Sequence, residues 1–515
     1  MNYFTYARGS HLDRFLDSLY DLLHGLTGMK PENGLPENPA LPPPQPQDAL
    51  TRHGYKQELK REIGWFSSFA MSFSIIAVTT GLFVTYGAGL QTAGPAFIWT
   101  WPIVGAGQFL LALVFAKLAR RIPLSGSVYQ WTRELGGDSL AWWAGWLMII
   151  WLLAGLAAVC YALASYTLST FGVATSDRNL VIATAAVLLS IALINHLGVK
   201  TASLVNDVMV LAQIAVILVV GILLLIISEV HKTNSFHFLF THPGHPGGMA
   251  FLGPLAFSSL AAAWTITGFE GAANLAEETK LPERLVPFAI VSSEVFSVII
   301  GFIILLGFTL AIPSLDVVSK DPAPFAYIMD HRFPHTVTVV AMAIILVEMY
   351  ACALANLTTI GRVAWAMARD RQLPASSWLG KLNSRKVPAN AMWFTAMVAA
   401  IFTWWAKFEI VIAGVSSLAA YITYLMVVAC SLPSGSHKWQ VSGDLPHSPI
   451  VPRPLGTVTL IWLLICLGAL TLPSSAWIND EAIVVVLLLG LCLWLPTRKS
   501  RQIPGAPPQR SELIP

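Results

Sequence analysis

Long apolar runs follow one another along almost the whole chain after Gly64, separated by short polar stretches. A membrane-spanning helix needs about 20 apolar residues to cross a hydrocarbon layer of ~30 Å. Runs of this length occur twelve times, so the pattern predicts an all-α integral membrane protein with twelve transmembrane helices. The predicted spans are 65–92, 95–117, 138–170, 178–195, 203–228, 251–276, 286–312, 335–368, 390–406, 409–432, 454–474 and 480–497.

The composition indicates the same class of protein. Hydrophobic residues make up 55% of the chain and charged residues 11%, whereas a soluble domain carries about 25% charged residues. We therefore expect the folded chain to face a lipid bilayer. The net charge of +3 is small and gives no reason to expect a nucleic-acid partner.

Two of the apolar runs contain small polar residues near their middle, Thr79-Thr80-Gly81 in the first and Thr267-Gly268-Phe269-Glu270-Gly271 in the sixth. An unwound helix in a membrane leaves backbone N–H and C=O groups without partners. The cost is several kcal/mol per group unless a cavity or a ligand lies beside the break. Broken helices at matching places in two halves of a chain are typical of transporters with a site near the membrane midplane. We therefore expect a small-molecule site between the two breaks.

Positive charge is distributed unevenly among the loops, and Lys and Arg accumulate on the cytoplasmic side of membrane proteins. If the N-terminus lies in the cytoplasm, only five of the 31 Lys and Arg residues fall in outer loops. These five are Arg178, Lys232, Lys320, Arg332 and Lys407. The distribution predicts a multi-pass protein of the cell membrane with both termini in the cytoplasm.

The chain divides into four predicted regions. They are a cytoplasmic N-terminal tail (1–63), a ten-helix core (64–432), helices 11 and 12 (433–497) and a cytoplasmic C-terminal tail (498–515). Within the first tail, residues 11–26 have the spacing of an amphipathic helix, and residues 31–49 are rich in Pro, Asn and Gln, which predicts a disordered linker. The tail lacks the apolar run and small-residue cleavage site of a removable signal peptide.

Five separated motifs resemble those of the amino acid/polyamine/organocation permeases. They are Thr79 to Val84 with Ala93 to Ala96, Lys117 to Tyr129, Asn195 with Gly198-Val199-Lys200 and Asn206, Gly268-Phe269-Glu270 with Glu277 to Lys280, and Ala368-Arg369-Asp370 with Leu373-Pro374. The likeness covers roughly residues 60–500, and Gln130-Trp131 is similar to the amino acid/choline transporter branch. It implies a leucine-transporter-like fold of two inverted five-helix repeats, with helices 1 and 6 broken and two extra helices at the end.

The resemblance assigns a role to the first break. In the family this break usually reads Gly-Ser/Thr-Gly, and its backbone amides bind the substrate carboxylate. Here Thr79 stands where the first glycine is expected, followed by Thr80 and Gly81. A β-branched residue is unfavourable at positive φ, so Thr79 leaves a decarboxylated amine, choline or a longer amino acid open as substrates.

Further substrate contacts are expected from the sixth and eighth spans. Thr267 and Gly268 belong to the second break, and Trp264 precedes Gly268 by four residues. Trp264 matches a family position where an aromatic ring closes over the substrate, and an indole face can also hold a cation. Asn356 falls where family members contact substrate. Additional candidates for polar lining come from the tenth span: Ser416, Ser417 and Tyr421.

Several acidic residues lie in or beside the apolar runs. Glu270 is near mid-membrane, where ionisable groups are costly and usually functional, and the resemblance supports a gating or proton-sensitive role. Glu348 shares a helix face with Asn356 and lies about 12 Å further out along the helix. It could attract a cationic substrate or carry a proton, or it could be a neutral or paired carboxyl inside the bundle. Glu277 and Glu278, at the cytoplasmic end, are expected to pair with Arg or Lys in loops.

The energy source stays open at the level of the sequence. Some sodium-independent relatives carry a Lys seven residues after the position of Asn206, and this chain has Gln213 there. An amide does not titrate near neutral pH, which excludes proton coupling through such a Lys. Thr358 or Thr359, with carbonyls of the first break, could offer oxygen ligands to sodium. Proton-driven, sodium-driven and exchange modes remain, and we favour proton coupling through Glu270 or Glu348.

These features predict a secondary active transporter that moves an amino acid or small organic amine by alternating access. Two alternatives share the fold: a permease selective for choline, polyamines or γ-aminobutyrate, and a nutrient receptor that binds without transport. A membrane-embedded enzyme would need His, Asp or metal ligands clustered within the spans, and the sequence shows no such cluster. We therefore expect no enzymatic activity and no cofactor. The expected partners are the small-molecule substrate, a co-transported proton or sodium ion, and lipid.

Overall fold

The computed structural model describes residues 49–244, 247–321, 323–403, 409–432, 450–472 and 477–500. The predicted amphipathic segment at 11–26, the linker at 31–49 apart from its last residue, and the chain beyond Ser500 lie outside these residues.

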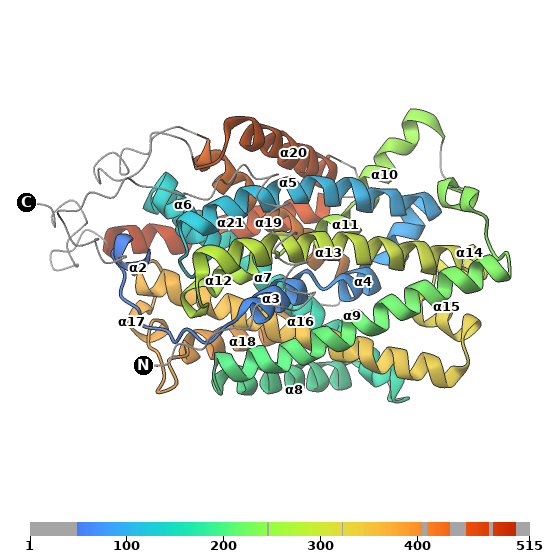
Figure 1. Ribbon diagram of the computed structural model, residues 1–515, viewed down its shortest axis with the longest axis horizontal. Coiled ribbons are helices and arrows are strands. Elements are labelled where there is room, and N and C mark those ends of the chain that lie inside the picture. Colours follow the sequence, from blue (N-terminus) through green and yellow to red (C-terminus); the bar gives the residue numbers. More distant parts are fainter. Residues whose placement is uncertain are drawn as a thin grey trace, which may run out of the picture. The chain divides into compact units, whose positions relative to one another are not determined.

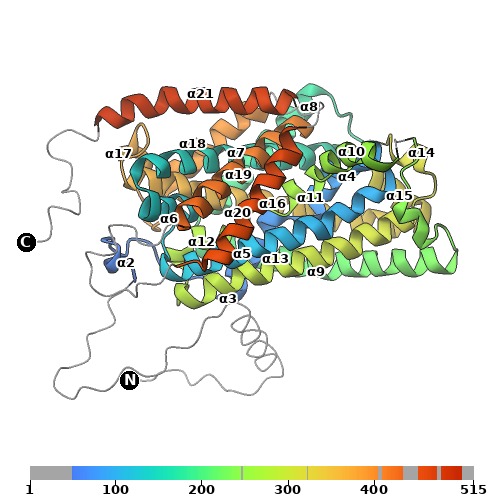
Figure 2. The ribbon, with the colours of Figure 1, turned by 90° about the horizontal axis from the view of Figure 1, so that it is seen from above.

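The chain separates into two units, Met1–Lys56 and Gln57–Pro515. In the described part of the first unit the backbone forms one short helix, α2 (Ala49–Arg52). Among the described residues, the long helices belong to the second unit, drawn from two directions in Figures 1 and 2. In the part of this unit that the structure describes there is no β-strand, only an isolated parallel bridge between Ile63 and Thr279.

Every predicted span has a helical counterpart in the second unit. Two spans are composite: span 1 is α3 (Trp65–Ile76) and α4 (Val78–Ala93), and span 6 is α10 (Leu252–Ser258), α11 (Leu260–Thr265) and α12 (Gly271–Asn274). The other ten are α5 (Thr100–Arg121), α7 (Asp138–Thr170), α8 (Asp177–His196), α9 (Val199–Val230), α13 (Pro282–Leu310), α16 (His335–Arg369), α18 (Ala389–Thr403), α19 (Glu409–Ser431), α20 (Arg453–Thr471) and α21 (Trp477–Ser500).

Length and hydropathy support this correspondence. Ten described segments are long and apolar enough to cross a membrane, and the first of them, Trp65–Arg121, contains spans 1 and 2 together. The ninth span is shorter, since its apolar part is Ala389–Phe402. Short elements join the spans: η1 (Gly94–Trp99), α6 (Ser127–Gly136), η2 (Phe236–Phe240), η3 (Gly248–Phe251), η4 (Ala276–Glu278), α14 (Leu315–Val318), α15 (Pro324–Arg332) and α17 (Ser376–Leu379).

The two halves of the core pack with matching partners. Span 3 (α7) of the first half packs on span 10 (α19) of the second. Their equivalents in the opposite halves, span 8 (α16) and span 5 (α9), also pack together. The halves meet where equivalent helices touch, as α5 and α13, α7 and α16, and α8 and α18 do. Figures 1 and 2 show α5 and α13 lying side by side. These contacts fit the expected five-plus-five repeat.

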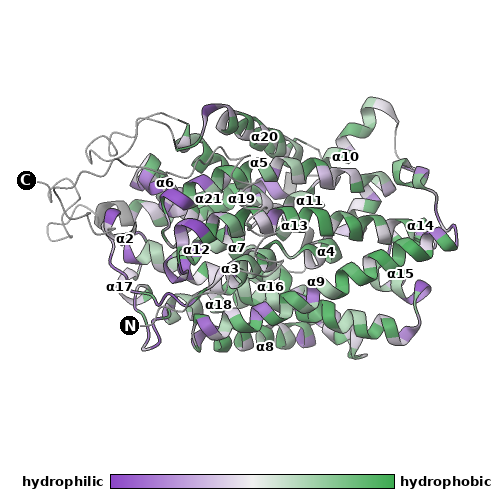
Figure 3. Ribbon diagram, in the orientation of Figure 1, coloured by the Kyte–Doolittle hydropathy of each residue, from purple (hydrophilic) through white to green (hydrophobic). Residues whose placement is uncertain are grey.

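Apolar side chains cover the outside of the helices as well as the core. Leu211 on α9, Ile461 on α20 and Leu488 on α21 are each more than half exposed. Figure 3 shows hydrophobic colour along the long helices, with hydrophilic colour at α6. Water would penalise so much exposed apolar surface, so these faces are suited to lipid.

Candidate functional site

The first break is a single residue. Helix α3 ends at Ile76, and Ala77 adopts a left-handed conformation with φ 42° and ψ 60° before α4 begins at Val78. The prediction that Thr79-Thr80-Gly81 is itself unwound is therefore wrong by two positions, because these residues form the first turn of α4. A small residue takes the left-handed conformation, which a β-branched Thr would resist.

Gly81 serves a close approach of helices instead. A Cβ atom at this position would lie 2.2 Å from Oγ1 of Thr265 on α11. Such a distance is far inside van der Waals contact, so only glycine lets α4 and α11 approach as closely as they do. The two broken spans are thus in direct contact beside the first break.

The second break lies where the sequence placed it. Helix α11 ends at Thr265, Gly268 has a φ of 94°, and α12 begins at Gly271. A Cβ on Gly268 would lie 2.2 Å from Cγ2 of Ile75 on α3. Gly268 therefore meets two requirements at once, a left-handed backbone and close packing against the first span.

Ser72 joins the two broken spans, and sequence reasoning missed it. Its hydroxyl donates to the carbonyl of Phe269 at 2.7 Å and accepts from the amide of Ala272 at 2.8 Å. Both groups belong to the unwound segment or the first turn of α12, where backbone groups lack helical partners. A serine in an apolar helix is common, and its pairing with a distant break has no local sequence signal.

A cavity lies between the breaks and is bordered by α7, α16 and α19. The described residues that line it are Ile75, Ile76, Ala77, Thr80, Gly81, Trp151, Gly155, Val159, Trp264, Thr265, Thr267, Cys352, Asn356 and Ser416. Five of the seven predicted substrate contacts are among them: Thr80, Gly81, Trp264, Thr267 and Asn356. The other two, Thr79 and Gly268, lie in the same two segments but do not line the cavity. Trp151 was not predicted.

Hydrogen bonds fix several of the lining side chains. Trp264 donates through Nε1 to Oγ of Ser416 at 3.3 Å, and Ser416 donates to the carbonyl of Trp151 at 3.1 Å. Asn356 donates to the carbonyl of Cys352 at 3.1 Å, which leaves its amide oxygen as an acceptor. The hydroxyl of Thr80 is buried without a hydrogen-bond partner in the part of the chain that the structure describes.

Glu348, Gln213 and Thr79 come together beside this cavity. The backbone amide of Thr79, in the first turn of α4, donates to Oε1 of Glu348 at 3.2 Å. Gln213 on α9 donates to the same oxygen at 2.7 Å. Glu348 is 2% exposed, and its other oxygen has no partner among the described residues. The carboxyl thus caps the N-terminus of a half-helix, where backbone N–H groups and the helix dipole favour an anion.

The two threonines considered for sodium differ in their surroundings. The hydroxyl of Thr358 lies 2.6 Å from Oδ1 of Asn195 and 2.7 Å from the carbonyl of Leu354. The hydroxyl of Thr359 is buried and has no partner within the described ranges. Neither residue lines the cavity.

Glu270 lies at the start of α12 and contacts the tenth span. The hydroxyl of Tyr424 on α19 donates toward the Glu270 carboxylate, at 3.0 Å from Oε2 and 3.2 Å from Oε1. The same hydroxyl accepts from the amide of Gly268 at 3.2 Å. Tyr424 therefore holds the second break and its acid together, and the carboxylate is fully buried.

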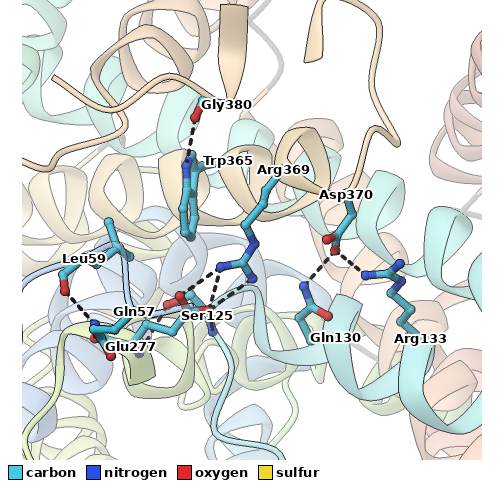
Figure 4. A network of polar contacts seen from close by, with 10 residues as sticks. All are labelled: Gln57, Leu59, Ser125, Gln130, Arg133, Glu277, Trp365, Arg369, Asp370 and Gly380. Atoms are coloured by element: carbon cyan, nitrogen blue, oxygen red, sulfur yellow. Dashed lines mark hydrogen bonds and ion pairs between the residues drawn. The ribbon is translucent and has the colours of Figure 1, made fainter. Parts of the chain in front are cut away.

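A cluster of ion pairs lies where α6, η4 and α16 meet, and we call it the α6–α16 cluster (Figure 4). Glu277 pairs with Arg369 at 2.9 Å and accepts from the amide of Ser125. Glu278 accepts two hydrogen bonds from Arg362, at 2.6 and 3.0 Å. Asp370 pairs with Arg133 of α6 at 2.8 Å. The expectation that Glu277 and Glu278 pair with loop cations is wrong, since both partners are on α16.

Comparison with known proteins identifies the family. The amino acid permease family matches residues 63–493. The amino-acid permease BAT1 of Arabidopsis thaliana is 28% identical over 87% of this chain and 94% of its own length. The branched-chain amino acid permease BcaP of Bacillus subtilis is 25% identical over 89% of this chain and 97% of its own.

A solved structure shows the same fold. The manganese transporter of Eremococcus coleocola superposes with a TM-score of 0.54 at 15% identity, over 86% of this chain and 97% of that one. With the two broken spans and the paired contacts of the halves, this match confirms the leucine-transporter-like fold. The expectation of a transport protein and not an enzyme is also confirmed, because the chain belongs to the amino acid permease family.

Proposed function

We propose that this chain carries a neutral amino acid across the cell membrane by alternating access, driven by protons, with Thr80, Gly81, Trp264, Thr267 and Asn356 as substrate contacts. The position of the cavity supports this site. It lies between two half-helices, where the N-terminus of α4 favours a carboxylate and the C-terminus of α3 favours an ammonium group. Both ends of an amino acid backbone would have partners there.

The lining of the cavity favours an uncharged side chain. Among the described residues that border it, Cys352 is the one with an ionisable side chain, and the rest are apolar or neutral polar residues. Ile75, Val159 and Trp151 offer an apolar surface. A polyamine would bring a second charge into this space without a carboxylate to meet it. The names of the relatives, which include a branched-chain amino acid permease, agree with a neutral amino acid.

The observation that carries the coupling proposal is the position of Glu348. Its carboxyl accepts a hydrogen bond from the backbone amide of Thr79 at the N-terminus of α4. A substrate carboxylate would bind at the same helix end. Two carboxylates at one helix N-terminus repel each other, so binding of the substrate favours a protonated Glu348. By thermodynamic linkage, protonation of Glu348 favours binding of the substrate to the same extent. Gln213 keeps one hydrogen bond to this acid.

The loop charges support the orientation. With both termini in the cytoplasm, the α6–α16 cluster and its Arg362 and Arg369 lie on the cytoplasmic side, as expected where positive residues accumulate. In this orientation the cluster closes the cavity toward the cytoplasm by joining η4 to α16. A plasma-membrane location is part of the proposal.

The test is uptake of radiolabelled leucine into proteoliposomes containing the purified full-length chain. An inward gradient of one pH unit corresponds to ~1.4 kcal/mol and should support about tenfold accumulation. Unlabelled choline and spermidine should compete poorly. Specific binding of leucine without accumulation, under either a proton or a sodium gradient, would identify a receptor. Accumulation that follows sodium and ignores pH would reject the proton.

A further inference from the structure

A buried acid outside the candidate site has no role in the proposed transport mechanism. Glu294 lies in the middle of α13, and its side chain is fully buried. Both of its carboxyl oxygens lack a hydrogen-bond partner among the residues that the structure describes. It belongs neither to the cavity lining nor to the α6–α16 cluster. An ionisable group at such a depth is costly and is usually functional.

The packing of α5 against α13 places Gln108 opposite Glu294. A Cβ on Gly301 would touch Trp101, and a Cβ on Gly105 would touch Val298, so α5 residues pair with α13 residues in antiparallel order. Gln108 is seven residues, about two turns, beyond Trp101, and Glu294 is seven residues before Gly301, so Gln108 and Glu294 lie at the same level. Gln108 is also fully buried, and its amide oxygen has no partner within the described residues.

The tenth span closes this group. Gln108, which lies opposite Glu294, donates through Nε2 to the hydroxyl of Tyr421 on α19. The ring of Tyr421 packs against Tyr424, with centroids 6.2 Å apart. Tyr424 in turn donates to Glu270 at the second break. Tyr421 and Tyr424 on α19 thus connect the surroundings of Glu294 to Glu270.

The hydrogen-bonding groups of this cluster do not balance if Glu294 is ionised. Its two oxygens and the amide oxygen of Gln108 are all acceptors, and the hydroxyl of Ser297, one turn along α13, makes no hydrogen bond to any described group. A protonated Glu294 supplies the missing donor. Turning the Gln108 amide around would provide one N–H, which does not offset the cost of a buried charge that lacks a cation.

We propose that Glu294 is a second proton-binding site, separate from the substrate cavity, which holds its proton in the conformation described here. In this step the carboxylic acid donates its O–H to the amide oxygen of Gln108, and on release the proton passes to water admitted between α5, α13 and α19. The proposal does not depend on the identity of the substrate.

The charged and titratable groups around α13 leave this acid without a close counter-ion. Lys117 on α5 is nine residues beyond Gln108, about 13 Å along the helix. Asp207 is on α9, which packs against the face of α13 that carries Gly307, opposite the face of Glu294. Helix α9 also carries Lys200 and Glu229 near its two ends, and α13 itself carries Glu283 and Arg284 in its first turn. Other charged or titratable groups on neighbouring described elements include Tyr421, Tyr424, Cys466, Glu270, Tyr86, His237, Arg120, Arg121, Glu277 and Glu278, of which the last two pair with α16.

Infrared spectroscopy of the purified chain in lipid nanodiscs tests the proposal without any substrate. A protonated carboxyl gives a C=O stretching band that an ionised carboxylate does not. We expect such a band above neutral pH in the wild type and its loss in Glu294→Gln, which matches the shape of the protonated acid. Glu283→Gln, in the first turn of the same helix, is the matched control and should leave the band unchanged.

A second variant keeps the test decisive if Glu294→Gln does not fold. Gln108→Leu retains the acid and removes its acceptor, so the band should move to higher frequency as the hydrogen bond weakens. A spectrum that is the same in the wild type and in Glu294→Gln would overturn the proposal. A band that appears only after sodium and potassium are removed would overturn it as well, since it would show that the site binds a metal cation.

Discussion

Replacing Gly268 by Ala tests whether the second break is as tightly constrained as its geometry indicates. The backbone at Gly268 has a φ of 94°, which costs an L-residue about 1–2 kcal/mol. The new Cβ would lie 2.2 Å from Cγ2 of Ile75, and overpacking of this kind costs about 1–3 kcal/mol. The conformation described here should therefore lose about 2–5 kcal/mol relative to others.

A shift of Ile75 or of the backbone at Gly268 should also change the cavity, because Ile75 and Thr267, the residue before Gly268, both line it. We expect leucine uptake in proteoliposomes to fall to background while the variant still inserts in the membrane, and its thermal unfolding midpoint to drop. Gly253→Ala is the matched control. Gly253 lies in α10 of the same span and has open space around its Cβ position, so this change should leave uptake and stability intact.

A double variant separates the two contributions. Ile75→Ala removes the atom that the new Cβ would strike, so Gly268→Ala combined with Ile75→Ala should recover the overpacking part and leave the backbone part. Thermal unfolding is the proper measurement, since Ile75 itself lines the cavity. If Gly268→Ala behaves like Gly253→Ala in both assays, the reasoning about this break is refuted.

Three further changes probe other parts of the mechanism. Glu348→Gln should abolish leucine accumulation driven by a pH gradient while leucine exchange persists, and gradient-driven accumulation in this variant would contradict the role of the acid. Glu278→Gln leaves Arg362 buried without its counter-ion and should lower the free energy of unfolding by about 3–5 kcal/mol, whereas adding Arg362→Met should restore most of the thermal stability. Equal losses of stability in the single and double variants would argue against a paired buried charge. Trp264→Phe removes the hydrogen bond to Ser416 and should raise KM for leucine about two- to tenfold, and an unchanged KM would argue against this contact.

Much of the fold could be predicted because lipid imposes a simple code. A span needs a run of apolar residues of fixed length, and all twelve predicted runs correspond to helices. The second break was also located correctly, because it contains Gly268, and a glycine within an apolar run signals a place where the backbone can adopt a positive φ. The ninth span follows the code least well: within the described residues its apolar part, Ala389–Phe402, is shorter than a full crossing.

The parts that sequence missed are contacts across the fold. The first break falls at Ala77, a residue that is common in helices and carries no signal of a left-handed conformation. Gly81 looked like part of that break, but its value lies in contact with Thr265, 184 positions away by the numbering. The partners of Glu277 and Glu278 were expected in loops because both acids lie at the cytoplasmic end, yet both arginines belong to α16, Arg369 at its last residue and Arg362 two turns earlier. Long-range pairing of this kind leaves no periodicity to detect.

The buried acids of the core divide into two kinds, and the division bears on where protons act. Glu277 and Glu278 form ion pairs with arginines, and separating each pair requires water to solvate both charges. Glu348 and Glu270 face an amide, a glutamine and a tyrosine, which are neutral groups that can accompany either protonation state. Each of these two acids also joins a half-helix to a helix outside it. A movement of the half-helices must break that contact, and a proton lowers the cost by removing the charge. Under the proposed function, proton-coupled steps therefore belong at the two breaks, and the α6–α16 cluster acts as a gate opened by hydration.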